Sequence, residues 1–153
     1  MNIVSSDSSK KISGDTRNNW VTMMFVTHQR YKCFKKQQHI DTCINAFKEL
    51  ERFGFEFGEF GFAGDHVHFQ VNIPKRYSVE TAEIMLKSYS AKKIFESHPG
   101  FRKRYPRGVF WSGYEHHAST GLINLEESTR YLQDQQRHHG ITVIPVGQQQ
   151  LPN

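Results

Sequence analysis

The clearest pattern along the chain is a strict alternation of apolar and polar residues between positions 66 and 73. Valine, phenylalanine and isoleucine take every second position, and two histidines, a glutamine and an asparagine take the others. A period of two is typical of a β-strand that buries one face. The Gly64-Asp65 pair predicts a tight turn before this strand, and Pro74 is expected to end it.

Apolar alternation predicts further strands before and after this one. A first strand is expected from Trp20 to Phe34. Over residues 54–65, phenylalanines alternate around Gly58, where we expect a bulge or bend. Another strand is expected over residues 109–118, and residues 141–153 would add a short edge strand.

Helical spacing of apolar residues separates these strands. The first predicted helix covers residues 39–53 and ends at Gly54. The second covers residues 78–97 and begins at a serine that can cap it. A third is predicted over residues 124–139, where Asn124 and a glutamate three positions later form the N-terminal signal.

The order of these elements is β-α-β-β-α-β-α, which is two βαβ units split by a hairpin. We therefore expect an α+β fold: a ferredoxin-like antiparallel sheet with helices on one face, plus a C-terminal helix. A chain of 153 residues has room for one domain. We place it at residues 20–140, after a polar, flexible N-terminal tail at 1–19 and before a C-terminal tail at 141–153.

Composition narrows the class of protein. A formal net charge of +5 and a pI near 9.3 favour a polyanionic partner. No apolar run approaches the roughly 18 residues of a membrane span, and the N-terminus lacks the apolar stretch of a signal peptide. Cys33 and Cys43 form neither a disulfide framework nor a zinc-ligand pair. These features predict a basic, cytoplasmic protein with no membrane partner.

His66 and His68 carry the first candidate chemistry. Two residues apart on a strand, they project from the same face with side chains roughly 6–7 Å apart, a separation that suits two imidazoles converging on one divalent metal. The alternative is two polar residues on a solvated sheet face.

Tyr131 and Gln135 are the second set of candidate catalytic residues. They are neighbours on one face of the last predicted helix. A tyrosine can act as a covalent nucleophile, and a glutamine carbonyl can bind a metal. The alternative is a tyrosine ring packed on the sheet and a glutamine in water. This helix has few apolar residues beyond Leu125 and Leu132, so something other than apolar packing should help to dock it.

Two basic clusters with interleaved aromatic residues are candidates for binding nucleic acid, because cations hold phosphates while rings stack on unpaired bases. The first basic cluster is Arg30, Lys32, Lys35 and Lys36 with Tyr31 and Phe34; the second is Arg102, Lys103, Arg104 and Arg107 with Phe101 and Tyr105. Lys87 is a further candidate. Each cluster could instead be an ordinary solvated loop.

The ordered set of these motifs closely resembles the HUH single-tyrosine transposases of the insertion-sequence 200/605 type. The resemblance covers roughly residues 20–139. Besides the histidine pair and the Tyr131-x-x-x-Gln135 spacing, it rests on Gln29-Arg30-Tyr31 and on residues 65–74, 86–95 and 110–121.

The resemblance implies an enzyme that cleaves and rejoins single-stranded DNA through a 5′-phosphotyrosine at Tyr131. His66, His68 and Gln135 would hold the metal, and their mixed nitrogen and oxygen ligands suggest Mg²⁺ or Mn²⁺. The family binds DNA hairpins at transposon ends and works as a homodimer whose tyrosine helix completes the partner's histidine pair. We expect a DNA-associated prokaryotic protein without a nucleotide cofactor, since no phosphate-cradling G-x-x-x-x-G-K-[ST] loop occurs.

Three other functions remain open from the residues. The chain could be a domesticated relative that nicks hairpins without mobilising an element. It could be a non-catalytic ferredoxin-like nucleic-acid-binding module, although such a module has no need of both motifs. A small metal-dependent hydrolase could use the histidine pair, but it lacks an obvious acidic ligand beside the pair and would leave Tyr131 idle.

Overall fold

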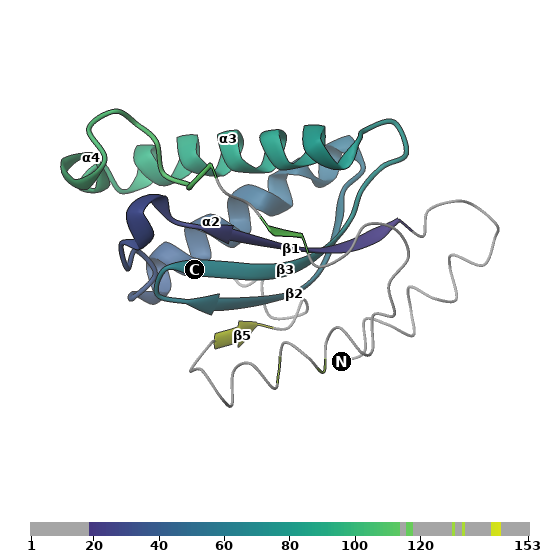
Figure 1. Cartoon of the computed structure of the whole chain (residues 1–153), viewed down its shortest axis with the longest axis horizontal. Coiled ribbons are helices and arrows are strands. Elements are labelled where there is room, and N and C mark those ends of the chain that lie inside the picture. The colour runs from purple at the N-terminus through teal and green to yellow at the C-terminus, as the bar shows by residue number, and fades with distance from the viewer. Residues whose placement is uncertain (1–18, 114–115, 118–129, 131–132, 134–141, 145–153) are drawn as a thin grey trace.

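The centre of the molecule is a single antiparallel sheet, shown in Figure 1. The computed structural model describes residues 19–113, 116–117, 130, 133 and 142–144. Over these residues, five strands lie in the order β4-β1-β3-β2-β5. Their bounds are Trp20–Val26 for β1, Glu56–Ala63 for β2, His66–Asn72 for β3, His116–His117 for β4 and Thr142–Ile144 for β5.

Two long helices, α2 (Gln37–Glu49) and α3 (Val79–Ser97), cover one face of this sheet (Figure 1). Each crosses between two strands, and the β2–β3 hairpin joins the two units, which gives the order 4-1-3-2 for the first four strands. The predicted α+β, ferredoxin-like fold is therefore confirmed. Shorter turns of helix are η1 (His28–Arg30), η2 (Leu50–Phe53) and α4 (Phe101–Arg104).

The core between the sheet and α2 is built largely from phenylalanine rings. Phe69 of β3 is fully buried, with ring centroids 4.8 Å from Phe47 of α2 and 5.1 Å from Phe25 of β1. Because Val67, Phe69 and Val71 all face the helices, the alternate residues of β3 must face the other side. This register decides which polar side chains can gather into a site.

Strand β2 contains the bulge that its glycines predict. Its pairing with β3 shifts between Phe57 and Phe60. Within the bulge, a Cβ added at Gly58 would fall well inside van der Waals distance of Gln70 Oε1. That oxygen already accepts a hydrogen bond from the Glu59 backbone N–H at 2.7 Å, and Gln70 is fully buried. The bulge therefore requires a glycine because a side-chain amide occupies the space beside it.

Replacing Gly58 with alanine is expected to lower the free energy of unfolding by about 1–3 kcal/mol, because the buried, hydrogen-bonded Gln70 must shift. Urea unfolding measures the change. Gly100→Ala is the matched control, since Gly100 is exposed and its Cβ would meet nothing within 4 Å. Equal stabilities of the two variants would contradict this account of the bulge.

The first strand is shorter than predicted, and the expectation of a strand to Phe34 is wrong. Strand β1 ends at Val26. Gln29 and Arg30 then adopt left-handed backbone conformations, with φ of 58° and 54°. Two such residues in succession cannot continue a strand, so the chain turns there and residues 31–36 run outside the sheet.

The strand expected over residues 109–118 is also interrupted. Trp111 forms an isolated bridge with Thr27, and the chain bends at Gly113. Among the described residues that follow, His116–His117 pair with β1 as β4. In the described part of this segment, β1 is therefore followed along its edge by one isolated bridge and one short strand.

The other element predictions are confirmed where the structure describes them. The Ser78 hydroxyl caps α3 by accepting a hydrogen bond from the Thr81 backbone N–H at 3.1 Å. Gly54 follows the first helical segment with a φ of 103°. Strand β5 is the predicted short edge strand and pairs with β2. None of the described helices is both long and apolar enough to cross a membrane.

The predicted third helix, with Tyr131 and Gln135, lies outside the described residues. Of residues 124–139, only Arg130 and Gln133 are described, and both are helical.

Candidate functional site

His66 and His68 lie side by side on the face of β3 that points away from α2 and α3. Their ring centroids are 5.1 Å apart, and the ring planes are nearly perpendicular at 86°. The placement follows from the buried alternate residues, Val67 and Phe69. The alternation thus brings the two imidazoles together, as the sequence predicts.

Asp65 fixes the orientation of the first imidazole. His66 Nδ1 lies 2.8 Å from Asp65 Oδ1, and the Arg30 guanidinium reaches Asp65 Oδ2 at 3.2 Å. Burial alone would raise the pKa of Asp65, but the hydrogen bond with His66 and the charge of Arg30 outweigh it and lower the pKa. The carboxylate is therefore ionised at neutral pH. With Nδ1–H held by Asp65, the Nε2 lone pair of His66 is left for a ligand.

The geometry of the pair fits one divalent cation. Two imidazole nitrogens, each about 2.1 Å from one ion, bring their ring centres about 5 Å apart, as observed. A carboxylate behind a ligating histidine is also the usual outer support of a metal site. The side chain of His66 is only 18% exposed. This burial argues against an ordinary solvated sheet face.

The strands beside the pair supply no further ligand. Met24 and Val26 of β1, and Gly61 and Ala63 of β2, are paired with the two histidines. None of these four residues offers a side-chain nitrogen or oxygen. Within the described part of the chain, no group of three or more His, Cys, Asp or Glu residues could hold a metal ion. The residues paired with the two histidines on β1 and β2 therefore provide no further ligand.

The two basic clusters, far apart in the sequence, meet in space. The Arg104 guanidinium lies over the Tyr31 ring, 3.9 Å from its centroid. The Tyr105 hydroxyl donates a hydrogen bond to the His28 carbonyl at 2.7 Å and so joins α4 to η1. The clusters therefore form one basic and aromatic surface rather than two separate loops.

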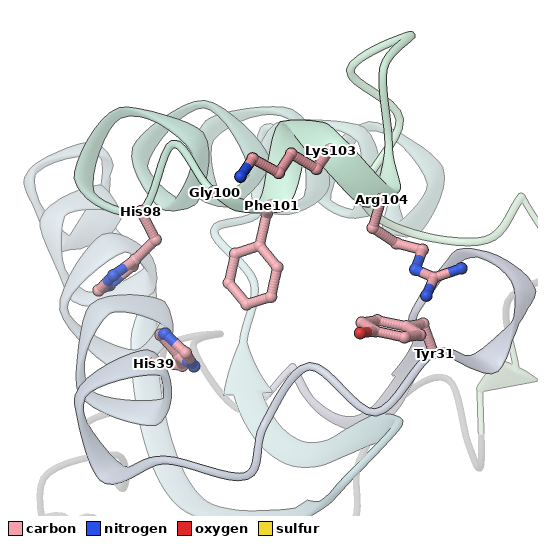
Figure 2. Close-up of a pocket in the computed structure, with 7 residues that line it drawn as sticks. All are labelled: Tyr31, His39, His98, Gly100, Phe101, Lys103 and Arg104. Carbon is pink, nitrogen blue, oxygen red and sulfur yellow. The ribbon is translucent and has the colours of Figure 1, made fainter.

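A pocket opens in this surface, with a volume of about 700 Å³ (Figure 2). Its walls come from the segment after β1, from the start of α2 and from the turn around α4. The lining residues are Tyr31, His39, His98, Gly100, Phe101, Lys103 and Arg104. Figure 2 shows the rings of His39, His98 and Phe101 at one end and Tyr31 beneath Arg104 at the other.

The remaining predicted DNA-binding residues differ in their surroundings. Six of them are exposed: Arg30, Lys32, Lys35, Lys36, Arg102 and Arg107. Lys87 is instead half-buried, and its ammonium donates a hydrogen bond to the Ser112 carbonyl at 2.9 Å. It also lies 5.3 Å from the centroid of the Phe25 ring. Lys87 is thus tied into the fold, whereas the other six side chains reach the solvent.

Sequence reasoning missed three residues of these sites. The sequence pattern predicts Asp65 only as part of a turn, although a carboxylate directly before a His-x-His pair is a usable signal for an orienting group. His39 and His98 carried no signal, because their approach depends on how α2 and α3 pack. Tyr131 and Gln135 lie outside the described residues.

Comparison with known proteins gives a family and a fold. A family model described as "Transposase IS200 like" matches residues 16–135, which is most of the chain. No curated protein matches this chain.

Two solved structures share the fold. One is a candidate transposase from Deinococcus radiodurans R1, with a TM-score of 0.61 and 15% identity over 80% of this chain and 94% of that chain. The other is a REP-associated tyrosine transposase bound to a REP hairpin, with a TM-score of 0.52 and 12% identity over 82% of this chain and 70% of that one. At these identities the structures support the fold alone, whereas the family model covers both the histidine pair and the two basic clusters. The chain therefore belongs to the family of IS200-like transposases.

Proposed function

We propose that this transposase cleaves and rejoins single-stranded DNA at transposon ends through a covalent 5′-phosphotyrosine at Tyr131. The observation that carries the proposal is the strand-borne histidine pair, with His66 held by an ionised Asp65. The basic, aromatic surface begins at Arg30, which contacts that same aspartate. A DNA backbone bound to this basic surface would therefore pass close to His66 and His68.

His66, His68 and Gln135 would hold a divalent cation, Mg²⁺ or Mn²⁺, with neutral nitrogen and oxygen ligands. When bound, such a cation supplies Lewis acidity at a phosphodiester oxygen. Asp65 keeps the His66 ring in the tautomer and orientation that ligation needs. The absence of further nitrogen or oxygen side chains among the paired residues on β1 and β2 supports a third ligand from another element.

In the cleavage step, the Tyr131 hydroxyl oxygen attacks the scissile phosphorus. The Tyr–O–P bond forms as the bond between phosphorus and the 3′ oxygen breaks, and the departing 3′ oxygen takes up a proton. Because the unperturbed pKa of tyrosine is about 10, Tyr131 must lose its proton as it attacks. In the rejoining step, a 3′-hydroxyl oxygen attacks the phosphotyrosine phosphorus, the Tyr–O–P bond breaks, and the tyrosine oxygen takes up a proton. The phosphodiester is thus restored without ATP.

We propose a DNA hairpin as the substrate. The REP-associated tyrosine transposase that shares this fold is bound to a REP hairpin, which supports a folded single strand as the ligand here. The exposed cations of the two basic clusters would bind its phosphates, and the exposed Tyr31 ring offers a stacking surface.

We also propose a homodimer in which each subunit supplies the helix with Tyr131 and Gln135 to its partner's histidine pair. The described helices α2 and α3 cover the opposite face of the sheet, so neither of them lies against the histidine pair (Figure 1). Mixing a Tyr131→Phe chain with a His66→Ala chain tests this arrangement, because only sharing between subunits would restore an intact site.

The experiment that tests the function uses hairpin-bearing single-stranded DNA taken from the ends of an element, incubated with the protein and Mn²⁺. We expect a protein–DNA adduct that survives denaturation and disappears with EDTA. Duplex DNA of the same sequence serves as the control. Failure to form an adduct on authentic element-end DNA would overturn the proposal.

Replacing Asp65 with asparagine is expected to raise the Mn²⁺ concentration for half-maximal cleavage by about 10–100-fold, the usual effect of losing an outer carboxylate. Saturating Mn²⁺ should restore most of the rate, because the ligands themselves remain. The matched control is Asp41→Asn on the exposed surface of α2, which should leave the metal titration unchanged. A lower rate at every Mn²⁺ concentration, with no shift of the midpoint, would contradict the orienting role.

A further inference from the structure

We propose that the pocket between η1, α2 and α4 binds one unpaired nucleotide of the DNA strand, with its base against Phe101, His39 and His98 and its two flanking phosphates at Lys103 and Arg104. This inference rests on the proposed function, because it assigns a subsite for the same substrate. The experiments below can therefore overturn the nucleotide pocket without overturning the proposed function.

The size of the pocket suits one nucleotide. Its volume of about 700 Å³ lies within the range of about 300–1,000 Å³ that is typical of small-ligand sites. Figure 2 shows side chains entering it from segments that are distant in sequence, so the pocket is a product of the folded core. A single base with its sugar and phosphate would fit, whereas a duplex would not.

Rings form the inner end of the pocket. His39 and His98 meet edge to face, with centroids 4.5 Å apart, and Phe101 lies 4.8 Å from His39. Phe101 is held from behind by the buried Phe110, whose ring centroid is 5.6 Å away. These rings are therefore positioned before any ligand arrives, and a nucleobase can stack on them whatever its identity.

The imidazoles of His39 and His98 are better partners for the polar edge of a base than for a phosphate. Burial and the neighbouring His98 lower the pKa of His39, and burial lowers that of His98, so both are uncharged at neutral pH. The His39 ring is held by a hydrogen bond with the Cys33 backbone, and its Nδ1 is buried. His98 Nε2 is 2.8 Å from the Thr42 hydroxyl, which fixes its ring.

Two cations lie along one side of the pocket: in Figure 2 the Lys103 ammonium points toward the His98 end, and the Arg104 guanidinium lies over Tyr31 at the other end. Lys103 and Arg104 are both exposed, and Arg104 is stacked on Tyr31 at 3.9 Å. The stacked guanidinium still presents its N–H groups in the plane of the fork, where phosphate oxygens bind. Arg30, next to Tyr31, contacts the Asp65 that orients His66. A strand anchored in the pocket therefore lies at the same end of the sheet as the histidine pair.

Photo-crosslinking tests the assignment directly. The probe is a hairpin oligonucleotide whose unpaired positions carry 5-iodouracil one at a time, and the crosslinked peptides are identified by mass spectrometry. We expect crosslinks to Tyr31, His98 or Phe101 from one unpaired position. A second arm measures the binding of a free deoxynucleoside monophosphate by itself, which should be much weaker than binding of the hairpin because it lacks the neighbouring phosphates of the strand. Binding as tight as that of the hairpin would show that the pocket takes free nucleotides and would overturn its assignment to the DNA strand.

Binding of the same hairpin to variants gives the independent measurement. Phe101→Leu is expected to weaken binding about tenfold by losing one stacked base. Lys103 is exposed, so Lys103→Ala should not affect folding. The change should weaken hairpin binding and reduce the slope of log affinity against log salt concentration by about one. Its control is Lys75→Ala, an exposed lysine just beyond the far end of β3 from His66.

The outcomes separate the inference from the function. Crosslinks that map elsewhere, or variants that bind like the Lys75→Ala control, would overturn the pocket assignment while adduct formation with Mn²⁺ leaves the proposed function standing. Absence of both DNA binding and adduct would overturn the two together. Crosslinks in the pocket with weakened binding by Phe101→Leu and Lys103→Ala support the assignment.

Discussion

Replacing Tyr131 with phenylalanine is expected to abolish the covalent protein–DNA adduct and to slow cleavage by about three orders of magnitude or more, while hairpin binding stays unchanged. The change removes one oxygen, the atom proposed to bond to phosphorus. Losing a nucleophile removes the whole covalent route, which is why the expected effect exceeds that of any positioning residue. Denaturing gels measure the adduct, and fluorescence anisotropy with the same hairpin measures binding.

Tyr77→Phe is the matched control for this variant. Tyr77 is half-buried, and its ring stacks on Phe55 at 5.7 Å, at the opposite end of β3 from the histidine pair. Removing its hydroxyl should leave adduct formation intact. An adduct that persists in Tyr131→Phe would show that another residue is the nucleophile, and the assignment of Tyr131 would then be wrong even if the reaction class is right.

The histidine pair could be predicted because alternation in a half-buried strand fixes which side chains share a face. Once Val67 and Phe69 are assigned to the core, His66 and His68 have only one face left. The same reasoning failed after Val26, where Gln29 and Arg30 take left-handed conformations. Neither is a glycine or asparagine, the residues that usually signal this conformation, so the sequence held no warning.

The nucleotide pocket shows a different limit. The two basic clusters were visible as composition, but their contact through Arg104 and Tyr31 depends on where α4 and η1 pack. His39 and His98 approach each other only because α2 and α3 lie side by side on one sheet face (Figure 1). Such long-range contacts follow from the three-dimensional packing, and no local period or spacing encodes them.

Replacing either histidine of the pair with alanine is expected to remove metal-dependent cleavage. His66→Ala and His68→Ala each delete a proposed ligand, so the loss of Mn²⁺ affinity should exceed the about 10–100-fold that outer-shell changes cause. Titration of Mn²⁺ followed by paramagnetic resonance reports this loss without relying on activity. Both side chains lie outside the phenylalanine core, on the other face of β3, so the fold should survive the change.

His98→Ala is the control for these variants, because it removes an imidazole from the nucleotide pocket and leaves the histidine pair intact. It should weaken hairpin binding but leave the Mn²⁺ titration unchanged, whereas His66→Ala should do the reverse. Opposite losses in two histidine variants would separate the metal site from the DNA-binding pocket and exclude a module that only binds nucleic acid. Unaltered Mn²⁺ affinity in both His66→Ala and His68→Ala would instead contradict the metal site, and the two imidazoles would then be polar residues of the sheet without a role in cleavage.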